Sequence, residues 1–165
     1  MTIPPDLPLR RAARSRTRTA PGLRWAVLLL AFASNLAFAA LDAAPSDLGD
    51  SGGQRTAATT ASGAAYTDIR HALPSGTVVH EYADASGQVF AVSWAGPFKP
   101  DLKLLLGRHF DRLATGAAAQ RGERSRLDVE TGTLVIQSGG HMGAFEGRAW
   151  LPARLPAGFD PRAMR

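Results

Sequence analysis

The sequence contains no cysteine. This absence excludes a disulfide framework, a thiol nucleophile and any metal site with thiolate ligands. It also excludes the lipid anchor of bacterial lipoproteins, which is attached to a cysteine. A hydrophobic core must therefore supply the stability, and about 100 ordered residues are enough for one small domain but not for two.

The chain also lacks a net charge once its first 39 residues are set aside. The whole sequence has 19 basic and 14 acidic residues, a formal net charge of +5. Residues 1–39 hold 6 of the basic and 1 of the acidic residues, which leaves 13 of each in the remainder. A basic protein usually suggests nucleic acid or an anionic membrane as its partner. The balanced remainder argues against both.

Residues 1–39 have the pattern of an export signal. Six arginines lie in residues 1–24, an apolar run covers residues 25–38, and Ala37-Phe38-Ala39 is a small-x-small cleavage site. The run is shorter than the roughly 20 apolar residues of a spanning helix. We therefore expect a signal peptide over residues 1–39, cleaved near Ala39, and a periplasmic or secreted protein. The alternative is a retained leader that anchors the protein in the envelope.

Residues 40–64 contain few large apolar side chains and many small or polar ones. Such a segment buries too little surface to offset the entropy lost on ordering. We expect a disordered linker over residues 40–64 and a single small domain over residues 65–165.

Within that domain, apolar residues that alternate with polar ones predict strands, and turn residues separate them. The predicted strands cover residues 66–73, 77–82, 88–94, 126–130, 133–138 and 144–151. Gly139-Gly140 is expected to end the fifth of these strands.

One segment has helical periodicity instead. It begins at Pro100, and its apolar side recurs at three- and four-residue spacing through Leu102, Leu105, Leu106, His109, Phe110 and Leu113. Thr115-Gly116 is the expected stop. The order of elements predicts an α+β fold: an antiparallel β-sheet of about five to six strands with one amphipathic helix packed on its apolar face. The proline-rich tail, residues 152–165, is expected to be extended and packed locally.

Loop length predicts which faces the strands of each hairpin share. A three-residue loop with Gly87 in the left-handed region pairs Tyr82 with Phe90 and places Trp94 on the same face. An even loop would turn Glu81 towards that buried face, which costs more free energy. We therefore expect Tyr82, Phe90 and Trp94 to share a buried face and Glu81 to point away.

The second predicted hairpin turns at Thr131-Gly132. An even loop places Leu127 and Val129 on one face with Leu134 and Ile136, whereas an odd loop would bury an acid there. We expect the even register.

Several segments together resemble a known family. They are residues 75–82, 87–97, 100–107, 138–142 and 147–152. Their combination is similar to the bacterial domain-of-unknown-function family 2844 over nearly all of residues 66–159. The resemblance implies a small exported proteobacterial protein, and it implies no activity, cofactor or catalytic residue.

Ser138-Gly139-Gly140-His141 is the stretch that most suggests catalysis. Ser138 and His141 would act as nucleophile and base, with Glu146 or Asp128 orienting the histidine. The chain has no nucleophile elbow around Ser138 and no helix directly after it. We expect a glycine-mediated bend without catalysis. A small serine hydrolase is the alternative.

The four histidines, His71, His80, His109 and His141, do not match the spacing of any metal motif. We therefore expect no metal site and no cofactor. His80 and His109 lie at predicted core-facing positions, where a satisfied, partly buried histidine is typical.

Two further groups of side chains are candidates for a site. Glu81 and Glu146 would suit general acid–base chemistry, but nothing in the sequence sets their separation. Trp94, Phe98 and Trp150 are the large aromatics of the strands and their rims. Such residues usually belong to the core, with Phe98 in a loop as the exception. Phe98 and Trp150 are the candidate ligand contacts.

The arginines of residues 121–126 are interleaved with acids, which indicates a solvated loop and no nucleic-acid site. The sequence thus predicts an exported, non-enzymatic binding or accessory protein. Its expected partner is another envelope or secreted protein, and its only membrane contact is the leader.

Overall fold

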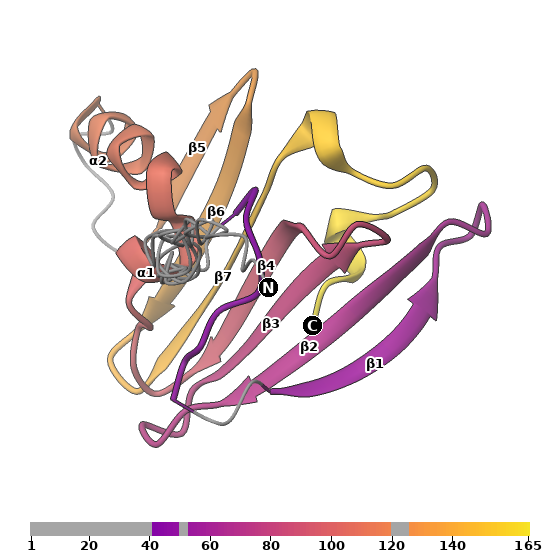
Figure 1. Cartoon of the computed structure of the whole chain (residues 1–165). Coiled ribbons are helices and arrows are strands. Elements are labelled where there is room, and N and C mark those ends of the chain that lie inside the picture. The colour runs from indigo at the N-terminus through magenta and orange to yellow at the C-terminus, as the bar shows by residue number, and fades with distance from the viewer. Residues whose placement is uncertain (1–40, 50–52, 120–125) are drawn as a thin grey trace, which may run out of the picture. The chain divides into compact units, whose positions relative to one another are not determined.

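The structure is a computed structural model that describes residues 41–49, 53–119 and 126–165. The expected signal peptide, Arg121 and Arg124 lie outside these ranges. In the described part, seven strands form one antiparallel sheet in the order β1-β2-β3-β4-β7-β6-β5 (Figure 1). Their bounds are β1 Gln54–Thr59, β2 Ala65–Ala72, β3 Val78–Asp84, β4 Val89–Gly96, β5 Leu127–Thr131, β6 Leu134–His141 and β7 Ala144–Trp150.

The helical residues follow β4 in three consecutive segments. These are α1 (Leu102–Leu106), the 3₁₀ turn η1 (Gly107–His109) and α2 (Phe110–Ala119). An antiparallel sheet with a helical layer agrees with the predicted α+β class. No helix among the described residues has the length and apolarity needed to cross a membrane.

The sheet has more strands than predicted because β1 lies inside the expected linker. The linker prediction is therefore wrong for these residues. β1 pairs with β2 from Gln54 opposite Arg70 to Thr59 opposite Ala65. Its side chains are small or polar and bury little surface. Backbone hydrogen bonds to β2 therefore hold the strand, and the composition of the segment does not reveal it.

Residues 41–49, which we call the N-terminal strap, are also part of the fold. The Leu41 amide donates to the Leu105 carbonyl at 3.1 Å, and the Asp42 amide donates to the Val89 carbonyl at 2.7 Å. Leu41 and Ser46 are both buried. A few anchors at fixed points thus order a segment whose composition is typical of a linker.

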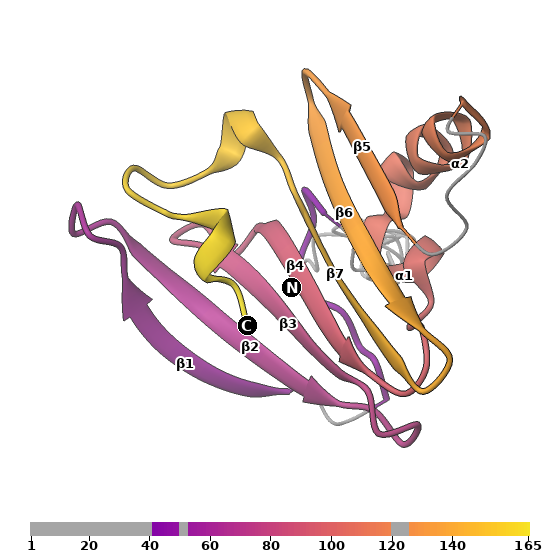
Figure 2. The same ribbon diagram turned by 180° about the vertical axis from the view of Figure 1, so that it is seen from behind.

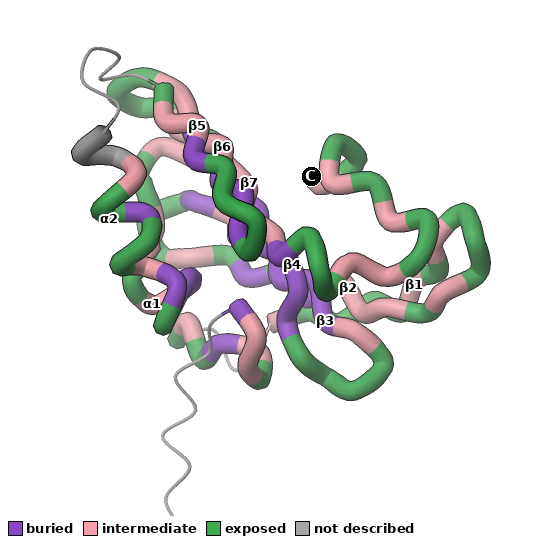
Figure 3. The backbone as a smooth tube through the Cα atoms, turned by 90° about the horizontal axis from the view of Figure 1, so that it is seen from above, coloured by how far each residue is buried: buried purple, intermediate pink, exposed green. Residues whose placement is uncertain are grey.

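The sheet is covered on both sides in its middle (Figure 3). The helices and the strap lie on one side, which we call the helix face; residues 152–165, the C-terminal tail, lie on the other, which we call the tail face (Figures 2 and 3). The helix-face core includes Leu41, Ile69, Val79, Val92, Trp94, Leu105, Leu106, Leu113, Val129, Leu134, Ile136 and Ala149. The tail-face core includes Tyr82, Phe90 and Ala91, against which Tyr66, Trp150, Leu155, Phe159 and Met164 pack.

The first hairpin has the predicted loop but not the predicted faces. Gly87 has a φ of +80°, and the Asp84 amide bonds the Gln88 carbonyl across the loop. Next to the loop, Ala83 is paired with Val89. The next residue of β3, Tyr82, is paired with Ala91, so Phe90 is the extra residue of a β-bulge.

The bulge separates residues that we expected to lie together. Phe90 stays with Tyr82 on the tail face, while Trp94 moves to the helix face. Glu81 is also buried there, opposite Val92. The expected shared face of Tyr82, Phe90 and Trp94 is therefore wrong, because the register shifts by one residue within the strand.

The second hairpin has the predicted register, with Val129 opposite Ile136. The predicted break at Gly139-Gly140 is wrong, because β6 continues through both glycines to His141. The chain reverses at the next two residues, and Gly143 there has a φ of +87°.

The helix does not stop at Thr115-Gly116, as the sequence suggested. Gly116 lies inside α2, which runs on to Ala119. A Cβ on Gly116 would stand 2.6 Å from Cγ1 of Val129 on β5. Gly116 thus permits a close approach between α2 and β5. In the sequence, a glycine needed for such packing cannot be told from one that ends a helix.

The C-terminal tail packs over a long distance and not locally. It forms two 3₁₀ turns, η2 (Pro152–Arg154) and η3 (Pro161–Ala163), and crosses the tail face. The Phe159 ring lies 4.8 Å from the Phe90 ring, centroid to centroid. The Arg165 amide donates to the Tyr82 hydroxyl at 3.1 Å. The expectation of an extended, locally packed tail is therefore wrong.

Candidate functional site

The structure does not bring the candidate catalytic residues together. Ser138 is buried, and its hydroxyl donates to the backbone carbonyl of Glu146 at 3.3 Å. His141 is exposed at the end of β6, and its Nδ1 lies 3.1 Å from the Met142 carbonyl. No hydrogen bond joins the side chains of Ser138, His141 and Glu146 within the described residues. Ser138 and His141 therefore bond different backbone carbonyls and not each other.

The two candidate acid–base carboxylates lie on opposite sides of the sheet. Glu81 is fully buried on the helix face, whereas Glu146 is exposed. Glu146 is two residues from Arg148 on β7, so both point towards the tail face. With the sheet between them, the two carboxylates do not flank one bond.

The aromatic candidates have different environments. Trp94 is buried at 1% exposure, and its indole Nε1 has no hydrogen-bond partner among the described residues. Trp150 packs against the tail-face core. Phe98 is 61% exposed, while its carbonyl accepts a hydrogen bond from the Thr77 hydroxyl at 2.7 Å. Phe98 is thus the exposed exception that the sequence indicated.

The histidines are spread over the fold. His71 is fully buried on the helix face, and His80 lies on β3 with its Nδ1 2.7 Å from a carboxylate oxygen of Asp68. His109 is buried, as predicted. The described residues contain no group of three or more His, Cys, Asp or Glu that could hold a metal ion.

Burial lowers the pKa of His109 below its usual value, and the neighbouring charges of Arg108 and Arg112 lower it further. The Nε2 atom of His109 has no hydrogen-bond partner in the described part of the chain. The neutral imidazole is therefore the form that this site favours.

A polar groove of about 550 Å³ lies over β4, β7, β6 and β5, beside the end of the C-terminal tail. We call it the polar groove. Its lining includes Ser93, Ala95, Arg126, Asp128, Gln137, Gly139, Glu146, Arg148, Met164 and Arg165. Trp94, Ser138, Gly140 and Gly147 also line it. Among the lining residues, the sequence had indicated Ser138 and Glu146 as catalytic candidates, Asp128 as a possible orienter and Trp94 as an aromatic candidate. The other lining residues were not predicted as site residues.

The sheet register builds the floor of this groove. Ser93 on β4 faces Arg148 on β7, Arg148 faces Gln137 on β6, and Gln137 faces Asp128 on β5. Residues that are opposite one another on neighbouring strands point to the same face. Four strands thus contribute one polar side chain each to a single row, which no spacing along the sequence reveals.

Arg148 is the central cation of that row. Its Nε–H donates to the side-chain oxygen of Gln137 at 2.9 Å, and Nη1 donates to the carbonyls of Pro161 and Arg162 at 3.3 and 3.4 Å. All three acceptors are neutral, and no carboxylate of the described residues forms an ion pair with Arg148. The groove therefore contains a guanidinium that is held in place but not neutralised.

The other charges of the groove are arranged differently. Arg126 Nε lies 2.7 Å from a carboxylate oxygen of Asp128, so these two groups neutralise each other at the rim. Glu146 adds a carboxylate to the same lining. The groove is consequently of mixed charge, with Arg148 as its fixed positive point.

The end of the tail forms one wall. The Ser93 hydroxyl donates to the Arg165 carbonyl, and the Tyr82 hydroxyl accepts from the Arg165 amide. Burial raises the pKa of Tyr82, although its hydrogen bonds with Ser93 and with the Arg165 amide act against this rise. Tyr82 thus serves as a neutral anchor for the tail.

A family described as a protein of unknown function, DUF2844, matches residues 37–164. The match covers well over half of the chain and includes the groove as far as Met164. The chain belongs to this family. The resemblance found in the sequence is therefore confirmed. No curated protein and no solved structure matches the chain significantly.

This DUF2844 protein has a buried polar cluster on the helix face that the sequence did not predict. The Glu81 carboxylate accepts from the Ser46 amide at 2.8 Å and from the Ser46 hydroxyl at 2.5 Å. His71 Nε2 lies 3.2 Å from the same carboxylate. Glu81 and His71 are both fully buried. The only signal in the sequence is a charged residue within a β-rich run.

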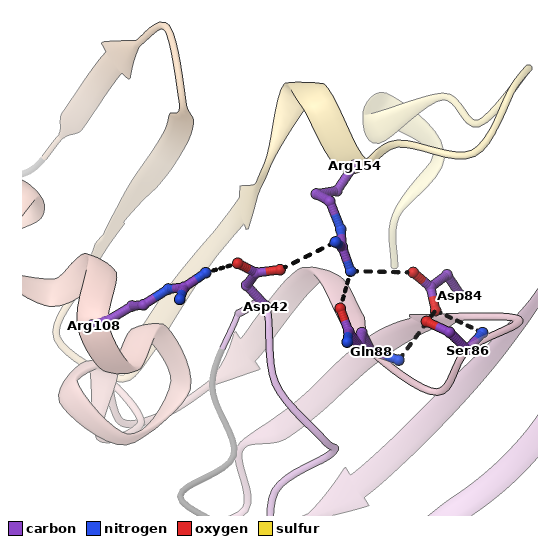
Figure 4. A network of polar contacts seen from close by, with 6 residues as sticks. All are labelled: Asp42, Asp84, Ser86, Gln88, Arg108 and Arg154. Atoms are coloured by element: carbon purple, nitrogen blue, oxygen red, sulfur yellow. Dashed lines mark hydrogen bonds and ion pairs between the residues drawn. The ribbon is translucent and has the colours of Figure 1, made fainter.

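A second polar network ties four parts of the DUF2844 fold together (Figure 4). Asp42 of the strap forms ion pairs with Arg108 of η1 and with Arg154 of η2. Arg154 in turn contacts Asp84 and Gln88 at the ends of the first hairpin loop. Both arginines are more than a third exposed, so these pairs add little stability each. Their effect is to hold strap, helix and tail in register.

Proposed function

We propose that this DUF2844 protein is an exported, non-enzymatic binding protein that holds an acidic group of its ligand at Arg148. One observation carries the proposal: Arg148 lies in a groove, fixed by neutral acceptors, and no carboxylate among the described residues forms an ion pair with it. The leader pattern of residues 1–39 supports export to the periplasm or beyond the cell.

The way Arg148 is held favours binding. Gln137 and the tail carbonyls accept hydrogen bonds from Nε–H and Nη1. Within the part of the chain that the structure describes, Nη2 donates no hydrogen bond. A guanidinium fixed on a strand loses little conformational entropy when a ligand arrives. The ligand then gains a charge-assisted hydrogen bond from a guanidinium that lines the groove.

The neighbouring charges narrow the class of ligand. Glu146 and the Arg126–Asp128 pair line the same groove. Two carboxylates near the anchoring cation repel a dense polyanion such as nucleic acid. A single acidic group, with hydroxyl or amide groups beside it, fits the mixture of donors and acceptors. An acidic sugar and an acidic peptide side chain both have this chemistry.

The test is an NMR titration with two probes of the same shape. Acetate carries the charge, whereas acetamide does not. We expect acetate to shift the Arg148 Nε–H signal and the Gln137 side-chain amide signals in a saturable way, and acetamide to leave them in place. Arg148→Gln should remove the response of the Gln137 signals.

Arg70→Gln is the matched control, because Arg70 is an exposed arginine of the same face on β2, outside the groove. It should leave the response intact. Equal shifts with both probes, or a response of the Gln137 signals that survives in Arg148→Gln, would contradict the proposal. A ligand captured from an envelope extract should likewise be lost in Arg148→Gln and kept in Arg70→Gln.

A further inference from the structure

Strand β1 is an open edge of the sheet. It is the first strand in the sheet order and has β2 as its only neighbour in the described part (Figure 1). Five of its six residues are exposed. An edge of this kind presents a row of backbone donors and acceptors that another strand can pair with.

The opposite edge, β5, is protected, whereas no described element covers the outer edge of β1. β5 carries Asp128 and Glu130, and Gly116 of α2 packs against its Val129. Charges and a covering helix are the devices that prevent pairing at an edge. β1 reads Gln-Arg-Thr-Ala-Ala-Thr: it has one charge, Arg55, no proline and otherwise short side chains.

The alternation of hydrogen-bonded pairs shows which backbone groups of β1 point away from β2. Just beyond the strand, the Thr60 amide donates to the Ala64 carbonyl at 2.9 Å, in the same register as the β1–β2 ladder. Hydrogen-bonded and non-hydrogen-bonded pairs alternate along an antiparallel ladder. The even-numbered residues therefore turn their backbone groups towards β2, while Arg55, Ala57 and Thr59 turn theirs outward.

We propose that β1 pairs antiparallel with β1 of a second copy of this chain, about a two-fold axis at Ala57. In this register Ala57 faces its own counterpart, and Arg55 faces Thr59 of the second copy. The pairing uses all three outward residues, and the smallest side chain lies at the axis. Each arginine is opposite a neutral threonine, so no like charges oppose each other.

Every other symmetric register leaves at least one of the three outward residues without a partner in the second β1. An axis at Arg55 would set two arginines opposite each other. An axis at Thr59 would lie at the end of the strand and leave Arg55 unpaired. The Ala57 register is also isologous, which is the commonest form of association between identical chains. A six-residue strand makes a small interface, so we expect a reversible, concentration-dependent dimer.

The absence of cysteine from the chain allows a specific test. In a hydrogen-bonded pair the two Cα atoms are about 5.5 Å apart, which is the usual distance in a disulfide. Ala57→Cys should therefore form a disulfide-linked dimer under mild oxidation of the chain purified after export. Ala58→Cys is the matched control, because residue 58 would face Thr56 of the second copy and not itself.

We expect at least about fivefold more linked dimer from Ala57→Cys than from Ala58→Cys on a non-reducing gel. Sedimentation of the cysteine-free protein should show a dimer that grows with concentration. Ala57→Pro should abolish this dimer with the circular dichroism spectrum unchanged, because it removes an outward amide only.

Equal cross-linking at positions 57 and 58 would overturn the proposal. So would a cysteine-free chain that stays monomeric up to about 1 mM, or a dimer that persists in Ala57→Pro. Should Ala57→Pro fail to fold, the comparison of the two cysteine variants still decides.

Discussion

Gly140 is a position where backbone and surroundings both require glycine. Its φ is +116°, and a Cβ there would stand 2.2 Å from the Ala144 carbonyl oxygen across the β6–β7 hairpin. We expect Gly140→Ala to lower the free energy of unfolding by about 1–3 kcal/mol or more, measured by urea denaturation.

Gly132→Ala is the control for this prediction, because Gly132 has no atom near the added Cβ and no positive φ. It should change stability by no more than about 0.5 kcal/mol. Equal losses at the two positions would show that the close contact at Gly140 is relieved without cost.

His109 should make stability depend on pH. Its pKa is lowered by burial first, and then by Arg108 and Arg112. The unfolded chain therefore binds more protons than the folded chain just below pH 6.5. Stability should fall as the pH drops through this range, and the full loss should be reached below the folded-state pKa.

His109→Gln should flatten this dependence. The measurement is urea unfolding of both proteins from pH 8 to pH 5. At pH 8 the histidine is neutral in both states, so any difference there reports packing alone. A wild-type profile parallel to that of His109→Gln would contradict the assignment.

At the scale of elements, the bulge in β4 decides how the tail is held. Phe90 has no exposed surface and contacts Phe159, Tyr66 and Tyr82 through edge or tilted ring pairs. Phe90→Ala should therefore lower the free energy of unfolding by about 3–5 kcal/mol. It should also release the tail, so that trypsin cuts earlier at Arg162.

Phe98→Ala is the matched control, because the Phe98 ring is 61% exposed. We expect a change within about 0.5 kcal/mol and no change in tryptic cleavage. Should Phe90→Ala cost less than about 1 kcal/mol, the tail-face core would contribute little to stability.

Glu81 is one of the points at which the strap is attached to the sheet. The carboxylate accepts two hydrogen bonds from Ser46 in a fully buried site. Glu81→Gln keeps the shape of the side chain but places an NH2 donor against one of the two donors of Ser46. We therefore expect the free energy of unfolding to fall by about 1–3 kcal/mol. Amide exchange of residues 41–46 should become faster.

The corresponding change at the exposed Glu130, Glu130→Gln, should leave both stability and exchange nearly unaltered. A Glu81→Gln protein with wild-type stability would show that the buried carboxylate is not what holds the strap.

At the scale of the whole molecule, the strap bears on where the proposed leader would be removed. Cleavage after Ala39 would leave Leu41 and Asp42, which bond the carbonyls of Leu105 and Val89. Cleavage near Ala44 would remove both. We therefore expect N-terminal sequencing of the protein from the envelope fraction to begin at Ala40.

A protein in the membrane pellet that still begins at Met1 or Thr2 would contradict this prediction. It would favour the alternative in which the leader is retained as an anchor.

Much of the local structure was determined by the sequence itself. The loop at Gly87 and the faces of Val129 and Ile136 follow from alternation and turn chemistry, which act over a few residues. The exposure of Phe98 and the burial of His109 follow in the same way. The absence of cysteine also determined, without any structure, that a core alone must hold this fold.

Only the tertiary structure decided the bulge at Phe90, the burial of Glu81 and the groove around Arg148. Each depends on partners that are distant in the sequence: Ser46 lies 35 residues from Glu81, and Arg165 lies 72 residues from Ser93. From the sequence we expected Glu81 to point away from the core, because burying a lone carboxylate is costly. The fold brings the strap to that carboxylate, and Ser46 supplies its hydrogen bonds. These bonds offset the free-energy cost of burying the charge, and no local sequence pattern can reveal them.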